Sequence, residues 1–177
     1  MTKAKLATLW LDGCSGCHMS LLDIDEGLIP IFERADMVYG PLVDQREFPE
    51  GVDVTLVEGA VGTEEDIEKM RRVRERTRIL VALGDCAVTA NISGARNSFK
   101  LRDLMNQIYV ESSDVDKGVP SAPALPVLLK HAVPVHEVVK VDLHVPGCPP
   151  SADTIKFVLT ELLDGRMPDL RTRTRFG

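Results

Sequence analysis

The chain has 177 residues, of which 44% are apolar and 27% are charged, and its formal net charge is −6. This length and apolar fraction suit a single folded domain and exclude a chain that is disordered throughout. The acidic charge excludes a protein drawn as a whole to nucleic acid, and no apolar run approaches the roughly 18 residues of a membrane span.

The first predicted element is a strand at residues 5–11, KLATLWL, whose Trp10 we expect in the core. A tight turn over residues 13–16 follows it, and residues 18–29 then carry the apolar spacing of a helix. Pro30 lacks a backbone N–H, and this places a kink or a helix boundary near it.

Runs of β-branched and apolar residues predict three further strands. MVYG at 37–40 is a short candidate, and VDVTLVEGAV at 52–61 is a stronger one. RILVALGDC at 78–86 is the clearest, because a continuous apolar run of this length is typical of a strand buried on both faces. Such strands indicate a parallel sheet that is covered by helices.

A helix at 64–76 separates the last two of these strands. Thr63 is expected to cap it, because the three acidic residues that follow favour the positive end of a helix. Its apolar stripe is formed by Ile67, Met70 and Val73. Its exposed face carries two pairs at the i, i+4 spacing that suits ion pairs, Glu65 with Lys69 and Glu68 with Arg72.

The C-terminal half is less regular until its last helix. Residues 98–110 are predicted to be helical, whereas residues 111–126 are rich in Ser, Asp, Gly and Pro and indicate an irregular excursion. Residues 136–148 contain a strand. Residues 151–165 form a helix that is capped by the serine at its start and closed near the glycine at its end. The tail, residues 166–177, shows no core pattern.

The alternation of strands and helices implies βαβ units, and therefore a parallel sheet with right-handed crossovers. We expect an α/β fold of the flavodoxin-like type, a three-layer sandwich with a mainly parallel sheet of strand order 2-1-3-4-5. No repeat or break in composition divides the chain. Residues 1–165 are therefore predicted to form one flavodoxin-like domain, followed by the C-terminal tail 166–177.

All four cysteines follow the predicted carboxyl end of a strand, and each has a glycine one or two residues away. The cysteines are Cys14, Cys17, Cys86 and Cys148, and the neighbouring glycines are Gly13, Gly16, Gly84 and Gly147. The carboxyl ends of parallel strands lie at one edge of the sheet, where ligands bind. We therefore expect the four thiols to form a single site.

Three kinds of thiol site are compatible with this pattern. A zinc ion accepts four thiolates, but structural zinc sites usually take them as two local pairs, and only the first pair is local here. Cys14 and Cys17 taken alone would also suit a thioredoxin-like redox dithiol. A [4Fe–4S] cluster fits the set best, because its four corners accept ligands from distant segments and glycine lets backbone N–H groups approach its sulfur atoms.

Several polar residues lie close to these cysteines in the sequence. Asp12 and Asp85 flank them, and we expect these carboxylates either to tune the site or a partner contact, or to cap helices or face solvent. Glu58 ends another strand and is a weaker candidate for the same edge, and His18 is expected to be a hydrogen-bonding neighbour and not a ligand. The tail contains four arginines, Arg166, Arg171, Arg173 and Arg175. We expect them to form either a docking surface for an acidic partner or a solvated chain end.

The stretches around the cysteines resemble a known family. They read LDGCSGCHMSLLD, VEGAV, ALGDCAVTANISGARN and HEVVKVDLHVPGCPPSADTI. From about residue 5 to 165 the chain resembles the small subunit of [NiFe]-hydrogenases, in particular that of the soluble, NAD-reducing group. The resemblance implies that the four cysteines hold the cluster nearest the nickel–iron centre. The implied role is electron relay between a large subunit with the NiFe centre and NAD-reducing diaphorase subunits with flavin and iron–sulfur clusters.

Two departures narrow the resemblance. Small subunits of respiratory hydrogenases carry a twin-arginine signal and C-terminal ligands for further clusters, and this sequence shows neither, so we expect one cluster and a cytoplasmic location. The related subunit of respiratory complex I has adjacent cysteines, whereas two residues separate Cys14 from Cys17 here. This spacing weakens the likeness to the complex I subunit. A complex I-like or F420-type oxidoreductase subunit is the alternative function, and a zinc-stabilised interaction module is a more distant one.

Two further expectations concern chemistry. Cleavage of H₂ needs a nickel–iron centre that is held by thiolates, but all four cysteines of this chain are assigned to the cluster. We therefore expect no catalytic residue in this chain. FMN binds at this edge of the sheet in the flavodoxin-like fold, but the first loop carries cysteines here. FMN is therefore possible but not favoured.

Overall fold

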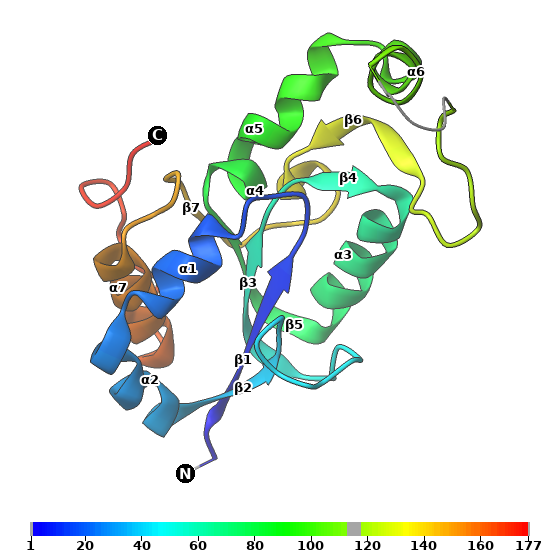
Figure 1. Cartoon of the computed structure of the whole chain (residues 1–177). Helices are drawn as coiled ribbons and strands as arrows, with labels where there is room; N and C mark the ends of the chain where they lie inside the picture. Colours follow the sequence, from blue (N-terminus) through cyan, green and yellow to red (C-terminus); the bar gives the residue numbers. More distant parts are fainter. Residues whose placement is uncertain (1, 113–117, 177) are drawn as a thin grey trace.

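The computed structural model describes residues 2–112 and 118–176. At its centre lies a five-stranded sheet of order β2-β1-β3-β5-β7, in which every neighbouring pair is parallel (Figure 1). Its strands are β1 (Ala4–Trp10), β2 (Ala35–Tyr39), β3 (Val52–Glu58), β5 (Thr77–Leu83) and β7 (Leu143–Val145). Taken in chain order, this is the predicted order 2-1-3-4-5, so the flavodoxin-like α/β fold is confirmed.

Helices cover both faces of the sheet (Figure 1). One face packs against α1 (Gly16–Leu22), α2 (Ile29–Arg34) and α7 (Ala152–Leu163), and the other against α3 (Glu64–Arg76). Successive residues of a strand point to opposite faces, so Leu6 joins the core beneath α1 and α7 while Ala7 joins the core beneath α3. The two cores give the predicted three layers.

The remaining elements are short. A second sheet pairs β4 (Val61–Thr63) antiparallel with β6 (Leu128–Val133). The short helices are α4 (Asp85–Thr89), α5 (Asn91–Gly94) and α6 (Leu101–Asn106), with single turns at Asp25–Leu28, Ala95–Ser98, Gln107–Glu111 and Val135–Glu137. In the part of the chain that the structure describes, no helix is both long and apolar enough to cross a membrane.

Two predicted elements are each divided in the structure. The helix expected at 18–29 breaks after Leu22, and Pro30 lies in the first turn of α2, where its missing N–H costs nothing. The strand expected at 52–61 ends at Glu58, because Gly59 adopts a φ of +91° and turns the chain into β4. A Cβ on Gly59 would lie 2.7 Å from the carbonyl carbon of Leu11, so the turn is packed against the end of β1.

Other predictions about single residues need correction. Trp10, the last residue of β1, is 50% exposed and not in the core. Neither predicted i, i+4 ion pair of α3 forms among the described residues, and Lys69 instead lies 3.5 Å from Asp66. The cap is confirmed, since the Thr63 hydroxyl and the Asp66 carboxylate form a reciprocal capping box.

The C-terminal segments also differ from expectation. The strand β6 was not predicted, and β7 occupies only three residues of the region 136–148. Residues 113–117 of the predicted excursion lie outside the described residues. The tail does contribute to the core, because Leu170 packs against the apolar cluster beneath α7.

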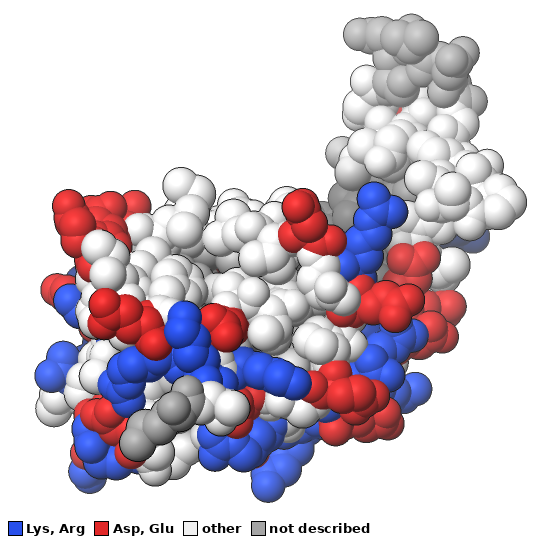
Figure 2. All heavy atoms as spheres, turned by 90° about the horizontal axis from the view of Figure 1, so that it is seen from below, with Lys and Arg blue, Asp and Glu red and all other residues white. Residues whose placement is uncertain are grey.

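Charged side chains are mixed in sign on the face where β1 begins. Figure 2 shows Lys and Arg interspersed with Asp and Glu across this face. Such mixing is typical of a solvated surface. The carboxyl ends of the strands, which the sequence singles out, lie at the opposite end of the sheet (Figure 1).

Candidate functional site

The four cysteines come from three connections at the carboxyl ends of strands. Cys14 lies in the turn after β1, Cys17 in the first turn of α1, Cys86 in α4 directly after β5, and Cys148 between β7 and α7. All four are free thiols, with Cys17 buried, Cys86 half-buried and the other two exposed. Burial raises the pKa of Cys17, and Glu58 and the other three cysteines raise it further. The structure therefore brings the four thiols close enough to interact electrostatically, as predicted.

The four glycines allow this approach in two ways. A Cβ on Gly84 would lie 2.2 Å from Cys17 Sγ, and a Cβ on Gly16 would lie 3.2 Å from Cys14 Sγ, so both glycines lie directly against sulfur. A Cβ on Gly13 would lie 3.2 Å from the Cα of Gly59, and one on Gly147 would lie 2.7 Å from the Cα of Pro150. The first two glycines leave room for sulfur, and the last two let backbone segments pack.

Hydrogen-bond donors reach two of the sulfur atoms from the segment after α4. Burial raises the pKa of Cys86, but the backbone N–H groups of Ile92 and Ser93 donate to its sulfur and oppose that rise. The side-chain amide of Asn91 donates to Cys148 Sγ at 3.5 Å. These donors were not predicted, because they depend on Ala90, which adopts a φ of +65° and redirects the chain between α4 and α5.

A buried acid and a histidine lie beside Cys17. The side chain of Glu58 is only 2% exposed, and its Oε2 accepts the backbone N–H of His18 at 2.8 Å and also contacts His18 Nδ1. His18 Nε2 is buried and has no hydrogen-bond partner among the described residues. Glu58 therefore faces the same edge as the thiols, and His18 is a hydrogen-bonding neighbour, as expected.

The two aspartates that flank the cysteines have different surroundings. Asp85 is 3% exposed, and its Oδ1 accepts the N–H of Gly147 at 2.6 Å. Asp12 lies against Gly62, where a Cβ would meet its carboxylate at 1.6 Å. Burial and the nearby Asp66 carboxylate raise the pKa of Asp12. Asp85 thus belongs to the cysteine-bearing loops, whereas Asp12 faces β4 and the start of α3.

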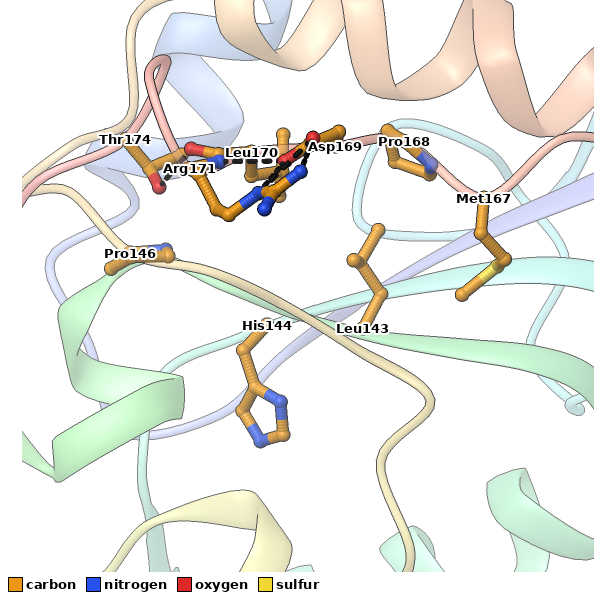
Figure 3. Close-up of a pocket in the computed structure, with 9 residues that line it drawn as sticks. All are labelled: Leu143, His144, Pro146, Met167, Pro168, Asp169, Leu170, Arg171 and Thr174. Carbon is orange, nitrogen blue, oxygen red and sulfur yellow. Dashed lines mark hydrogen bonds and ion pairs between the residues drawn. The ribbon is translucent and has the colours of Figure 1, made fainter.

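Two hollows lie near β7 and the tail. The first, of about 680 Å³, is largely apolar, and in the part of the chain that the structure describes no cysteine lines it (Figure 3). The Arg171 guanidinium lies 2.5 Å from the Asp169 carboxylate at this hollow, and Figure 3 shows the pair. The second, of about 350 Å³, has Cys148 in its wall together with Arg173 and Arg175. The tail thus brings two cations to the edge that carries the thiols.

Two of the tail arginines, Arg166 and Arg173, also make contacts within the chain. Arg166 lies 2.6 Å from Glu161 and 2.8 Å from Asp164, and Arg173 also stacks on Phe157 with its guanidinium 4.0 Å from the ring centroid. Paired guanidinium groups have less charge to offer an acidic partner, so the structure favours neither of the two roles expected for the tail as a whole.

The side chains at this edge can be compared with the donors of a single-ion site. Among the described residues, no group of three or more His, Cys, Asp or Glu side chains is arranged to hold one metal ion. Zinc would need its four donors within about 2.0–2.3 Å of a single point.

A family model described as NADH ubiquinone oxidoreductase, 20 Kd subunit, matches residues 14–162. The NAD-reducing hydrogenase HoxS subunit delta of Cupriavidus necator is 41% identical over 172 residues, which cover 95% of this chain and 82% of that relative. A vhu subunit of the F420-non-reducing hydrogenase from Methanocaldococcus jannaschii is 38% identical over 170 residues, which cover 96% of this chain and 59% of that relative.

The chain is also similar to chains in solved structures of hydrogenases. A crystal structure of NAD+-reducing [NiFe]-hydrogenase in the H2-reduced state contains a chain that superposes with a TM-score of 0.94 at 39% identity. The superposition covers 99% of this chain and 100% of that one. The [NiFeSe] hydrogenase of Desulfovibrio vulgaris Hildenborough matches at a TM-score of 0.59 and 18% identity, over 93% of this chain and 60% of that one. The second likeness concerns the fold alone.

Proposed function

The chain belongs to the NADH ubiquinone oxidoreductase 20 kDa subunit family, within which it is a hydrogenase small subunit, and we propose that it transfers electrons through one [4Fe–4S] cluster. Cys14, Cys17, Cys86 and Cys148 would hold the cluster as thiolates. When bound, such a cluster takes up and releases electrons one at a time.

The observation that carries this proposal is the meeting of four free thiols at one edge of the sheet. The residues around them also suit a cluster with net negative charge. The N–H groups of Ile92 and Ser93 and the amide of Asn91 point donors at sulfur. Donors of this kind stabilise cluster sulfur and help to set its reduction potential. Arg173 and Arg175 add positive charge beside Cys148.

We further propose that the electrons pass between the NiFe centre of a large subunit and a cytoplasmic, NAD-reducing diaphorase module. The relatives named above support this role, since two of them are named as parts of NAD-reducing hydrogenases. Three large apolar side chains that lie within six residues of a cysteine in the sequence are exposed, namely Trp10, Met19 and Ile92. Exposed apolar surface of this kind is typical of a protein–protein contact, so we expect the large subunit to cover it.

A second acceptor is favoured by one specific observation, which is the 38% identity to a component of an F420-non-reducing hydrogenase. In that case the cluster and its ligands would be the same, and only the module that takes the electrons would differ. Isolation of the native complex separates the two, because a bound flavin- and NAD-dependent diaphorase would support the first acceptor and its absence the second.

The cluster itself is tested by anaerobic purification of the full chain, followed by iron, sulfide, zinc and nickel analysis. We expect about four iron and four sulfide per chain, and a paramagnetic signal that develops on reduction. A colourless protein with one zinc would instead identify an interaction module. A metal-free protein with disulfide reductase activity would identify a dithiol enzyme, and either result would overturn the proposal.

A further inference from the structure

We infer that Asp85 and Ser20 are positioning residues that tie the three cysteine-bearing segments to one another through their side chains. The inference rests on the proposed function, because it concerns the geometry in which the cysteines would hold a cluster. Neither residue touches the cluster in this scheme. Each acts on the backbone that presents a thiol.

Asp85 connects the segment of Cys86 to that of Cys148. Its backbone N–H donates to the carbonyl of Gly147 at 2.9 Å, and its Oδ1 accepts the N–H of Gly147 at 2.6 Å. Asp85 directly precedes Cys86, and Gly147 directly precedes Cys148. The two hydrogen bonds therefore fix the separation of the two ligands one residue before each of them.

This connection begins where the sheet ends. The pairing of β5 with β7 stops at Leu83 and Val145, and the N–H of Gly84 then donates to the carbonyl of Val145 at 2.8 Å. Beyond that point, the backbone of the two segments diverges into α4 and the turn before α7. The hydrogen bond from a backbone N–H to a buried carboxylate is charge-assisted and therefore strong. It holds the two segments together beyond the last hydrogen bonds of the strand pair.

Ser20 connects the helix that carries Cys17 to the turn that carries Cys148. It is a buried residue of α1, one turn after Cys17, and its hydroxyl donates to the carbonyl of Pro150 at 2.6 Å. Pro150 lies two residues after Cys148. The two side chains thus link α1 to the turn that bears Cys148, and that turn to α4.

The hydrogen bonds of Asp85 and Ser20 would oppose a repulsion that is inherent in a four-thiolate site. Thiolates carry negative charge, so four of them at one edge of the sheet repel one another. Three loops that were free to move would relax apart under this repulsion. Hydrogen bonds from outside the ligand set hold the loops together without using any ligand atom.

The test compares Asp85→Ala and Ser20→Ala with a matched control, Thr55→Val. The control removes a buried 2.8 Å hydrogen bond between the hydroxyls of Thr55 and Thr77, which joins β3 to β5 away from the thiols. The full chain is purified anaerobically, and iron per chain, the rate of iron release to a ferrous chelator, the electron paramagnetic resonance spectrum after reduction and the Tm are measured.

We expect Asp85→Ala to release iron about tenfold faster than the wild type, with an altered spectrum, because a charge-assisted hydrogen bond is lost. Ser20→Ala should show a smaller acceleration in the same direction. Thr55→Val should lower the Tm without changing the release rate or the spectrum. Asp85→Asn keeps an oxygen that can accept the Gly147 N–H but loses the charge, so its rate of iron release should lie between those of the wild type and Asp85→Ala.

Two outcomes would overturn the inference. One is an Asp85→Ala protein that holds iron as long as the wild type with an unchanged spectrum. The other is a Thr55→Val protein that loses iron as fast as Asp85→Ala, which would reduce the role of Asp85 to general stability. A wild-type chain without iron and sulfide would instead refute the proposed function, so the two failures are distinguishable.

Discussion

Replacing Gly84 by alanine is predicted to destroy the site while leaving the fold intact. Gly84 has a φ of +83° and a ψ of 161°, a region that is essentially restricted to glycine and costs other residues about 1–3 kcal/mol. The new Cβ would also lie 2.2 Å from Cys17 Sγ, whereas ordinary contact begins at 3.4 Å. The sulfur or the backbone must therefore retreat by about 1 Å, several times the ±0.2 Å tolerance expected at a metal site.

The matched control is Gly165→Ala. Gly165 has a φ of +76°, but among the described residues nothing lies within 4 Å of a Cβ placed there, so this variant carries the backbone strain without the contact with sulfur. Both variants should lose Tm, and only Gly84→Ala should lose most of its iron and sulfide after anaerobic purification. If both variants kept wild-type iron content and the same spectrum after reduction, the reasoning from the Cys17 contact would be refuted.

Three other predictions concern charge, pH and helix capping. Glu58→Gln removes a buried negative charge beside the thiols, so the reduction potential should rise in a spectroscopic redox titration; an unchanged or lower potential would contradict the placement of Glu58. Burial opposes ionisation of Asp142, but hydrogen bonds from the Leu80 N–H and the Arg74 guanidinium outweigh burial and lower the pKa of this carboxyl. The ionised carboxylate therefore stabilises the fold above the unfolded pKa of about 3.9, and this stabilisation is lost as pH falls through the folded pKa. Asp142→Asn should therefore reduce the unfolding free energy at pH 6 and have little effect at pH 2, as measured by urea unfolding, and an equal loss at both pH values would exclude this explanation. Thr63→Ala removes the capping box of α3 and should lower the unfolding free energy by about 1 kcal/mol with no effect on iron content, so a loss of iron would show that α3 positions the thiols.

Local patterns predicted the sheet and the meeting of the thiols because both follow from where strands end. The continuous apolar run of β5 and the cysteine that follows it are visible in the sequence, and parallel topology then places Cys86 at the same edge as Cys14 and Cys17. The capping box at Thr63 was equally local, since its two members are three residues apart.

The errors arise where a distant segment decides the outcome. Trp10 continues the apolar pattern of β1, and nothing local in the sequence distinguishes it from the buried residues before it, yet it is half exposed. β6 forms only by pairing with β4, more than 60 residues away, as its Val133 is paired with Val61. The donors at Ile92 and Ser93 depend on the positive φ of Ala90, a conformation that the residue type does not indicate.

The same distinction separates two levels of control over the site. The sheet delivers the thiols to one edge, and its core residues, such as Leu56 and Val81, affect the site only through overall stability. The final placement of sulfur depends on contacts outside the core, namely Gly84 against Cys17 and Asp85 against Gly147. Core variants should therefore change Tm and iron retention together, whereas variants of these two contacts should change iron retention out of proportion to Tm. A proportional loss in both groups would mean that the edge has no geometry of its own beyond that imposed by the sheet.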